Sequence, residues 1–420
     1  MTASAAHTDG PAYRTASQYI DFGVDPAFDR DPYTSFAKLR GLGPVVVLTE
    51  ALQSEFGFPD NLLYRSAGRE VFLGLTYNAC RTIASDAKNF SVATAYQDTL
   101  AKAFGEILIT TDGPKHTQLK KLVLPSFAHR IVNEDLVSMA APLIKKELDE
   151  IAPRGRGELI ADFTSKFPFQ IVAKIFGIPP HLHQEAEELA TAGQRMGDDP
   201  AGAMAALAGM NAMYLKVVDD HRVNRADDLI GTLLDTEIDG VKLTDDEIVG
   251  FLKNIIAGGL DTTSRQVANL IYLLLENPDQ FDDLKTNPEL LEGAIQEGMR
   301  LVAAGGWTPR VALDDVEIEG VLIPKGSGVY PVIHSANRDP SRWENPDRFD
   351  IQRPRKMNMS FGAGAHACLG ANLSMLEQKV AMKGVLAQLK NLRKDQLRWH
   401  DAEMRGINLR SPTQLPVLWD

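Results

Sequence analysis

Residues 361–370 read Phe-Gly-Ala-Gly-Ala-His-Ala-Cys-Leu-Gly. Apolar residues at helical spacing follow this stretch, at Leu373, Leu376, Val380 and Leu386. Cys368 therefore stands just before a helix N-terminus, where the helix dipole and free backbone N–H groups favour a thiolate. Because glycines permit positive φ and close backbone approach, the stretch suits a thiolate that ligates a metal. The alternative is that Cys368 is a small buried hydrophobe, as most free cysteines are.

A second motif overlaps this cysteine stretch. Gly362-x-Gly364-x-x-Ala367 fits the degenerate glycine fingerprint of dinucleotide-binding proteins. Only about 50 residues follow Gly370, however, and a pair of mononucleotide-binding halves cannot fit there. Residues 356–360, which would have to supply the preceding strand, form a weak strand pattern. The sequence therefore disfavours a dinucleotide site.

The clearest predicted helix begins after Thr244. Thr244-Asp-Asp-Glu247 is a capping box, in which the hydroxyl caps a backbone N–H and the carboxylate reaches back to the helix start. Apolar residues follow at helical spacing, at Ile248, Phe251, Leu252, Ile255 and Ile256. The pattern continues through 270–275 and stops at Asn277-Pro278. Such a helix of about 32 residues, roughly 48 Å long, would cross an entire domain.

The middle of this helix breaks the apolar pattern. Residues 258–263, Gly-Gly-Leu-Asp-Thr-Thr, place two glycines and three short polar residues in the helix interior. One interpretation is a packed kink, because each glycine costs about 1 kcal/mol relative to alanine and threonine can bond the carbonyl four residues back. The other is a flat face on which a bulky ligand lies close to the backbone, with Asp261 and Thr262 as a proton relay.

Glu297 and Arg300 share a helix face at i, i+3 spacing. Such a pair is most often an ordinary surface pair. An irregular stretch rich in Pro, Gly and Asp follows it, however, from Asn337-Arg-Asp-Pro340 to Arg353, and leads directly to the cysteine stretch. This order favours a supporting role for the pair.

Composition limits the class of protein. The chain has 420 residues, with 44 Lys and Arg against 56 Asp and Glu, and a formal charge of −12. An acidic chain is a poor match to a nucleic-acid binder. Its two cysteines cannot form a disulfide framework, so we expect a reduced, cytoplasmic protein. The N-terminus shows no signal pattern, and apolar runs such as 270–275 are far short of the roughly 20 residues of a membrane helix, so we expect a soluble protein.

The order of patterns along the chain predicts a mainly α fold with small β-sheets. β-like runs at 45–48 and 71–75 indicate an early sheet, with an excursion at 51–68 between them. Helical patterns dominate from about 133 to 300. Since linker-like composition is lacking between 133 and 390, one large domain is favoured over several small ones.

Taken together, these segments resemble a cytochrome P-450, a haem-thiolate monooxygenase of the soluble bacterial kind. The cysteine stretch fits the family signature at its fixed positions, Phe361, Gly362, Gly364, His366, Cys368 and Gly370. Residues 258–262, the Glu297/Arg300 pair and Arg353 also fit, in the right order and spacing. The resemblance implies an α+β fold over a single haem domain, residues 20–420, with an N-terminal arm at 1–19. A long central helix would cross the haem.

The resemblance also implies roles for individual residues. Cys368 would be the axial thiolate on the iron of haem b, where its electron donation favours O–O cleavage. Asp261 and Thr262 would deliver protons to the distal oxygen. Three residues would support the cysteine stretch without taking part in catalysis: Glu297, Arg300 and Arg353. The cofactor-binding residues would be Phe361 and Gly370 beside the thiolate, and Arg310, His366, His116 and Lys120 at the haem propionates.

Lys120 departs from the family pattern. The helix that begins near residue 112 resembles the family's propionate-binding helix, in which an arginine usually sits four residues after the histidine corresponding to His116. A lysine supplies the charge there but not the planar bidentate fork.

The expected activity is insertion of one oxygen atom from O₂ into a small or medium apolar organic substrate, by hydroxylation or O-dealkylation. An iron–sulfur ferredoxin would supply the electrons, because the chain has the size of the haem domain alone. We expect a monomer that binds neither nucleic acid nor membrane. A peroxide-driven peroxygenase and a non-catalytic haem sensor or carrier are the alternatives. The Asp261–Thr262 pair counts against both, since neither needs a proton relay.

Two surfaces follow from the resemblance. A basic patch for an acidic ferredoxin would gather Lys115, Lys120, Lys121, Arg130 and Lys379, although a mixed solvated surface explains these residues equally well. The substrate pocket would be lined by the segment before His116, by 190–214, by the long helix around Ala257 and by 302–308. Candidate apolar walls are Met196, Met204, Met210, Met213 and Trp307, although helix core is the commoner place for such methionines.

Overall fold

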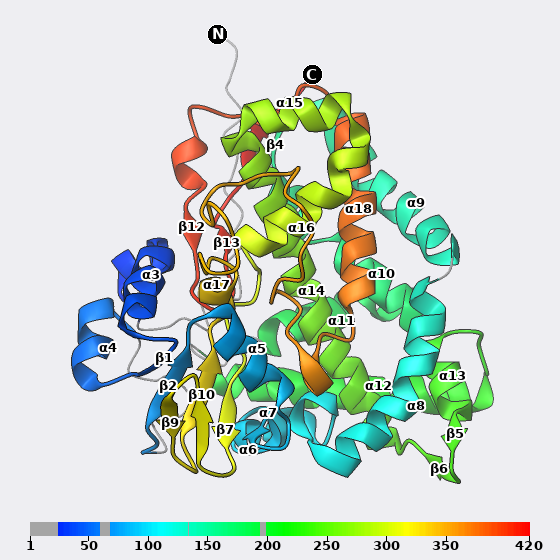
Figure 1. The fold of residues 1–420 in the computed structure, drawn as a ribbon. Coiled ribbons are helices and arrows are strands. Elements are labelled where there is room, and N and C mark those ends of the chain that lie inside the picture. The colour runs from blue at the N-terminus through cyan, green and yellow to red at the C-terminus, as the bar shows by residue number, and fades with distance from the viewer. Residues whose placement is uncertain (1–23, 59–67, 133, 194–198) are drawn as a thin grey trace.

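The computed structural model describes residues 24–58, 68–132, 134–193 and 199–420 (Figure 1). The arm predicted at 1–19, Met196 and residues 59–67 of the excursion predicted at 51–68 lie outside these residues. The start of that excursion is helical, because Thr49 caps helix α4 with a hydrogen bond from the Leu52 N–H.

Helices make up most of the described chain, as the sequence predicts. The α-helices are α2 Pro26–Arg30, α3 Pro32–Leu42, α4 Glu50–Phe56, α5 Tyr77–Ser85, α6 Ala93–Tyr96, α7 Leu100–Phe104, α8 Gly113–Val132, α9 Glu134–Ile151, α10 Phe167–Phe176, α11 His183–Gly193, α12 Pro200–Val223, α13 Leu229–Asp235, α14 Asp245–Glu276, α15 Pro278–Thr286, α16 Leu291–Leu301, α17 Ile333–Ala336 and α18 Ala371–Gln388. A short 3₁₀ turn, η7, spans Gly364–His366.

The strands are short and form small sheets. They are β1 Val45–Val47, β2 Val71–Gly74, β3 Phe90–Ser91, β4 Arg156–Glu158, β5 Glu237–Ile238, β6 Val241–Lys242, β7 Arg310–Ala312, β8 Val316–Ile318, β9 Val321–Ile323, β10 Gly328–Pro331, β11 Arg393–Lys394, β12 Met404–Arg405, β13 Ser411–Pro412 and β14 Pro416–Leu418. The largest sheet has the order β1-β2-β10-β7-β3. Its β1 and β2 confirm the strands predicted from the two early β-like runs.

The central helix α14 is the long helix that the sequence predicts. Its capping box is formed, because the Glu247 N–H donates to Thr244 Oγ1 at 3.2 Å and the Thr244 N–H donates to Glu247 Oε2 at 2.8 Å. It continues through the glycines at 258–259 and ends at Asn277. Helices α10, α12, α16 and α18 pack against it, so that α14 runs through the middle of the helical part (Figure 1).

The five-stranded sheet lies beside the helical part, next to α3, α4 and α5 (Figure 1). Strands β2 and β10 pair in parallel, with Val71 opposite Gly328. The chain leaves β10 into α17 and then into the long irregular segment that leads to Cys368. This connection brings the cysteine stretch back to the junction between sheet and helices, where η7 contacts α5. The predicted class, mainly α with small sheets, is confirmed.

Helix α12 qualifies the expectation that no segment could span a membrane. Within the described residues, one helix segment, Ala201–Val223, is both long enough and apolar enough to do so. Its most apolar window has a mean hydropathy of 1.3. Polar residues such as Asn211 and Lys216 interrupt this segment, so no unbroken apolar run marks it in the sequence. Helix α12 packs against α11, α13 and α14, and Met210, Tyr214 and Val218 are buried in the core.

Candidate functional site

The cysteine stretch forms a tight loop at the N-terminus of α18. The Cys368 N–H donates to the Phe361 carbonyl at 2.8 Å and closes the loop, while Gly362 and Gly364 adopt φ of 68° and 73°. Cys368 lies three residues before α18 begins at Ala371, as predicted. Its side chain is exposed on one side. Burial on its other sides raises the pKa of the thiol, and a hydrogen bond from the Gly370 N–H opposes that rise.

Gly364 seats this loop on the last turn of α5. A Cβ at this position would lie 2.6 Å from the Ser85 Cα and 2.8 Å from the Ala84 carbonyl oxygen. Since the residue also has positive φ, glycine satisfies two requirements here at once. The loop conformation is therefore set by contact with the sheet side of the molecule as well as by α18. Residues 356–360 form no strand in the structure, which agrees with the rejection of a dinucleotide site.

The polar break in α14 produces an open strip on the helix. Gly258 is exposed, and no heavy atom lies within 4 Å of the place where its Cβ would be. The neighbouring Gly259 faces Val172 of α10 instead, at 3.8 Å. Thr262 Oγ1 donates to the Gly258 carbonyl at 2.6 Å. The helix surface is thus open on the side where a Gly258 Cβ would lie, as the ligand interpretation of this segment predicts.

One hydrogen bond links the two motifs. Thr263 Oγ1, directly after the Asp261–Thr262 pair, donates to Ser374 Oγ of the first turn of α18 at 3.2 Å. Cys368 precedes this turn. The exposed thiol and the open strip at Gly258 therefore belong to two elements that pack against each other, the start of α18 and the middle of α14. A flat group that carries a metal needs a single strong ligand and an unobstructed face. These residues therefore fit the haem that the resemblance implies.

Three of the four side chains predicted to hold the propionates lie at the junction of α8 and the cysteine loop. The rings of His116 and His366 are 4.3 Å apart between centroids, and Lys120 Nζ donates to the Ala365 carbonyl at 2.7 Å. These three side chains join α8 to the cysteine loop. Arg310 comes from a different element, β7, and is buried, with Nη1 donating to the Pro309 carbonyl at 2.9 Å.

Asp112 anchors this junction, and the sequence analysis gave it no role. Its Oδ1 lies 2.9 Å from His366 Nε2, while Oδ2 accepts hydrogen bonds from Ser91 Oγ at 2.6 Å and from the Ala93 N–H at 2.8 Å. Burial alone would raise the pKa of Asp112, but the hydrogen bonds from His366, Ser91 and Ala93 lower it to about 2. Burial, His366 and Lys120 lower the pKa of His116 to about 4.

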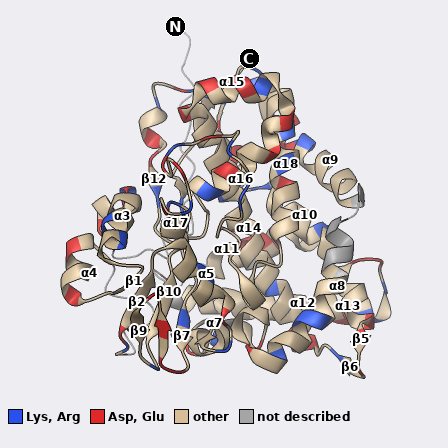
Figure 2. Cartoon of the chain, in the orientation of Figure 1, with Lys and Arg blue, Asp and Glu red and all other residues tan. Residues whose placement is uncertain are grey.

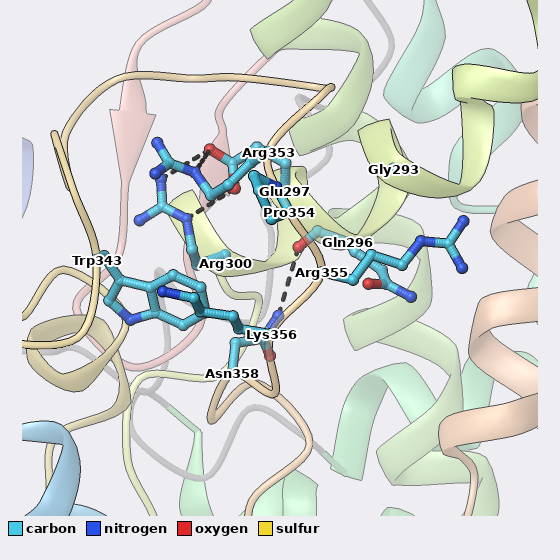
Figure 3. Close-up of a pocket in the computed structure, with 10 residues that line it drawn as sticks. All are labelled: Gly293, Gln296, Glu297, Arg300, Trp343, Arg353, Pro354, Arg355, Lys356 and Asn358. Atoms are coloured by element: carbon cyan, nitrogen blue, oxygen red, sulfur yellow. Dashed lines mark hydrogen bonds and ion pairs between the residues drawn. The ribbon is translucent and has the colours of Figure 1, made fainter.

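Glu297, Arg300 and Arg353 come together where α16 meets the irregular segment that precedes the cysteine loop (Figure 3). Glu297 accepts from Arg300 Nε at 2.7 Å and from Arg353 Nε at 3.0 Å. Their remaining N–H groups donate to backbone carbonyls of the irregular segment: Arg300 to residues 337, 346 and 348, and Arg353 to residues 344, 345 and 348. The i, i+3 spacing of Glu297 and Arg300 predicts their pair. The carbonyl partners could not be predicted, because every residue has a backbone carbonyl and the sequence does not show which ones accept these hydrogen bonds.

Asp261 has a partner that the sequence analysis missed. Arg265 Nε donates to Asp261 Oδ2 at 2.6 Å, and the arginine side chain is only 3% exposed. The i, i+4 spacing of the two residues is a signal that could have revealed this contact.

The predicted basic patch is partly neutralised. Lys115 Nζ lies 2.5 Å from Glu247 Oε1, and Lys120 is bonded within the fold. Lys121 lines a surface groove of about 630 Å³ between α8 and the β5–β6 hairpin. The side chain of Arg130 lies outside the described part. Figure 2 shows Lys and Arg interspersed with Asp and Glu, as the mixed-surface interpretation expects.

The methionines proposed for the pocket are divided between core and surface. Met210 and Met213 are buried in the main hydrophobic cluster, whereas Met204 is 49% exposed. Trp307 packs edge-on against Tyr330. The side chain of Ala257 is not among those described. Core packing therefore accounts for two of the methionines.

Comparison with known proteins gives one consistent family. The family model described as "Cytochrome P450" matches residues 201–289 and 279–414. The cytochrome P450 monooxygenase PikC of Streptomyces venezuelae is 30% identical over 95% of this chain and 94% of its own length. The mycinamicin IV hydroxylase/epoxidase of Micromonospora griseorubida is 29% identical over 84% of this chain and 90% of its own. The structure of CYP109Q5 from Chondromyces apiculatus matches with a TM-score of 0.80 and 26% identity, covering 94% of this chain and 97% of that one.

Proposed function

Because this chain belongs to the cytochrome P450 family and is a haem b monooxygenase, we propose that it oxidises an apolar organic molecule by hydroxylation or O-dealkylation. An iron–sulfur ferredoxin supplies the electrons one at a time. The protein acts as a cytoplasmic monomer. The observation that supports the proposal is the Thr263–Ser374 hydrogen bond, which joins the segment of α14 that contains Asp261 and Thr262 to α18, the helix that follows Cys368.

Cys368 is the proposed iron ligand. When bound, the haem supplies an iron that activates O₂, and a thiolate ligand favours O–O cleavage. The Gly370 N–H that bonds the sulfur draws off part of its negative charge, which tunes the metal through its ligand. Phe361 holds the Cys368 N–H through its carbonyl and so fixes the direction of the sulfur.

The basic residues at the α8–loop junction are proposed to hold the propionates. His116, His366 and Lys120 form one group, and Arg310 approaches from β7. Lys120 already spends one N–H on the Ala365 carbonyl. A lysine ammonium has three donors, so two remain for a carboxylate. This arrangement supports Lys120 as the residue that takes the place of the family's usual arginine.

Asp261 and Thr262 are proposed to deliver protons to the distal oxygen. The Thr262 hydroxyl donates to Gly258, which fixes the hydroxyl oxygen beside the open strip of α14 and leaves its lone pairs available as acceptors. Asp261 stands one residue earlier, and its side chain is 11% exposed. Protons pass from solvent to Asp261 and then to the region that Thr262 faces.

The substrate is proposed to be apolar and of small or medium size. The related mycinamicin IV hydroxylase/epoxidase acts on a compound that its name identifies. A screen should therefore extend from terpenoids and simple aromatics to macrolides. The readout is the haem spin-state shift that accompanies substrate binding.

The first experiment tests the thiolate. The reduced, carbon-monoxide-treated protein is expected to give the thiolate-type difference band, and Cys368→Ser is expected to abolish it. Cys80→Ser is the matched control, because Cys80 is fully buried and donates to the Gly74 carbonyl instead. A wild-type protein without the band would end the proposal. Peroxide-driven turnover that Thr262→Ala leaves unchanged would favour a peroxygenase instead.

The second experiment tests the ferredoxin. Lys121→Glu is expected to lower the ferredoxin-dependent rate and its sensitivity to salt, because Lys121 faces the surface groove beside α8. Lys285→Glu on α15 is the control for a charge change elsewhere on the surface. Equal rates for both variants would remove the basic surface from the proposal.

A further inference from the structure

Arg265 connects the acid of α14 to the C-terminal hairpin. Its Nε donates to Asp261 Oδ2 at 2.6 Å, one helical turn earlier, and its Nη1 donates to Ser411 Oγ of β13 at 2.7 Å. The side chains of Arg265 and Asp261 are 3% and 11% exposed. The Arg265 guanidinium therefore binds the Asp261 carboxylate through Nε and the Ser411 hydroxyl of β13 through Nη1.

The hairpin that receives Arg265 is itself firmly held. Strands β12 and β13 pair, with Arg405 opposite Ser411. Arg410, next to Ser411, donates to the backbone carbonyls of Asp29 and Arg30 at 2.7 and 2.5 Å. The Gly306 N–H donates to the Asn408 carbonyl at 2.6 Å. Ser411 is thus held in place by the hairpin. Its contact with Arg265 can therefore fix the guanidinium, and through it the Asp261 carboxylate.

A purely structural tie between α14 and the hairpin already exists one turn farther along. Asn269 Nδ2 donates to the Arg410 carbonyl at 3.0 Å and to the Val302 carbonyl at 3.3 Å, and Asn269 is fully buried. Asn269 joins the same two elements as Arg265 without contacting Asp261. The feature that distinguishes Arg265 is therefore its contact with the acid.

We propose that Arg265 is the positioning residue for Asp261: anchored by Ser411, it fixes the orientation of the carboxylate from which protons are delivered. The inference rests on the proton-delivery role given to Asp261 under Proposed function. Charge-assisted hydrogen bonds inside a protein are short and directional, and small misplacements of a reacting group are costly. A guanidinium can hold both partners through separate N–H groups in a fixed plane, whereas a lysine ammonium is a compact point donor.

The test uses the haem-loaded full chain with a plant-type ferredoxin, its NADPH-dependent reductase and the compound that gives the largest spin-state shift in the screen. Hydrogen peroxide released per NADPH consumed measures how often proton delivery fails. Arg265→Leu is expected to raise this ratio about threefold or more and to change the solvent deuterium isotope effect on turnover. The affinity measured by the spin-state shift should stay within about twofold, because the Arg265 side chain is only 3% exposed and is held between Asp261 and Ser411.

Four further variants separate positioning from general damage. Arg265→Lys should recover part of the coupling, since it keeps the charge beside Asp261 but cannot also hold Ser411. Ser411→Ala should raise the peroxide ratio less than Arg265→Leu, and it keeps the proposal testable if Arg265→Leu does not fold. Asn269→Ala, the matched control, should leave the ratio and the isotope effect at wild-type values. The double variant of Asp261→Asn with Arg265→Leu should release no more peroxide than Asp261→Asn alone.

The outcomes distinguish this inference from the function on which it rests. If Asp261→Asn raises the peroxide ratio while Arg265→Leu and Ser411→Ala do not, Arg265 does not position the acid and the inference is wrong. If Asp261→Asn also leaves the ratio unchanged, the proton-delivery role itself is wrong. If Asn269→Ala matches Arg265→Leu, the effect belongs to the hairpin contact in general, and the inference is again overturned.

Discussion

Arg300 donates two hydrogen bonds to Glu297, from Nε to Oε2 at 2.7 Å and from Nη2 to Oε1 at 2.8 Å, inside the fold rather than on its surface. The Arg300 side chain is 1% exposed and that of Glu297 is 4% exposed. The same carboxylate also accepts from Arg353 and from the Asp350 N–H. A buried carboxylate with these donors ties the irregular segment before Cys368 to helix α16.

Glu297→Gln is expected to destabilise the protein by about 3–5 kcal/mol, because it leaves two guanidinium groups without their buried counter-charge. Urea unfolding measures the loss, and the fraction of chains that retain haem should fall with it. Glu292→Gln is the control. Glu292 lies on α16, the helix of Glu297, and pairs with Arg355 at 2.9 Å, but both side chains of this pair are about half exposed. That change should cost less than about 1 kcal/mol. Equal losses in the two variants would contradict a supporting role for Glu297.

Gly364→Ala is expected to displace the cysteine loop from α5. The new methyl group would lie 2.6 Å from the Ser85 Cα, and the residue has φ of 73°. The combined backbone strain and steric contact should lower the free energy of unfolding by roughly 2 kcal/mol or more. The thiolate band after carbon monoxide treatment should also be weaker. Gly41→Ala in α3 is the control, since nothing lies within 4 Å of the added Cβ. A normal band in Gly364→Ala would show that the loop tolerates the shift.

Asp112→Asn is expected to loosen the α8–loop junction. The amide keeps one acceptor oxygen but loses the charge that His366, Ser91 and the Ala93 N–H all bind. Hydrogen bonds to charged groups contribute about 1.5–3 kcal/mol each, so a loss of about 2 kcal/mol is expected. The change should appear in urea unfolding and in faster haem loss to apomyoglobin. Asp315→Asn, an exposed aspartate whose Oδ1 accepts from the Lys325 N–H, should behave like the wild type.

The parts of this protein that the sequence predicts are those with local signals. Helix α14 was predicted from its first residue to its last because a capping box and an apolar period lie within one segment. The cysteine loop was predicted because glycines, a cysteine and a helix start are adjacent in the chain. The contacts of Asp112 could not be predicted, since His366 lies 254 residues away and both residue types are common.

Arg265 has one contact that a local sequence signal indicates and one that depends on long-range folding. Its spacing from Asp261 is a local helical signal, but a proton relay and an ion pair compete for the same aspartate, and sequence alone does not say which contact forms. The anchor at Ser411 lies 146 residues away and becomes visible only once the hairpin is placed. Function was therefore easier to predict than the residues that tune it.

Glu377 gives the pH dependence of stability a definite sign. It lies fully buried on α18, and burial raises its pKa to about 8, against a hydrogen bond with Thr263 that lowers it. Within the described part of the chain, its Oε1 has no hydrogen-bond partner. Above the ordinary glutamate pKa of 4.5, the unfolded chain releases this proton whereas the folded protein keeps it until about pH 8. Folding is therefore penalised progressively as pH rises through this window, by about 1.4 kcal/mol per pH unit.

Glu377→Gln removes this penalty, because a neutral amide of the same shape keeps the contact with Thr263 and has no proton to lose. The variant should be as stable as the wild type near about pH 5 and more stable than it near about pH 8. Urea unfolding across this range measures the difference, and Glu289→Gln, at an exposed glutamate, should show none. A difference between Glu377→Gln and the wild type that does not change with pH would mean that Glu377 is already ionised in the folded protein. The buried carboxyl would then need a cation or a water cluster beside it to hold its charge.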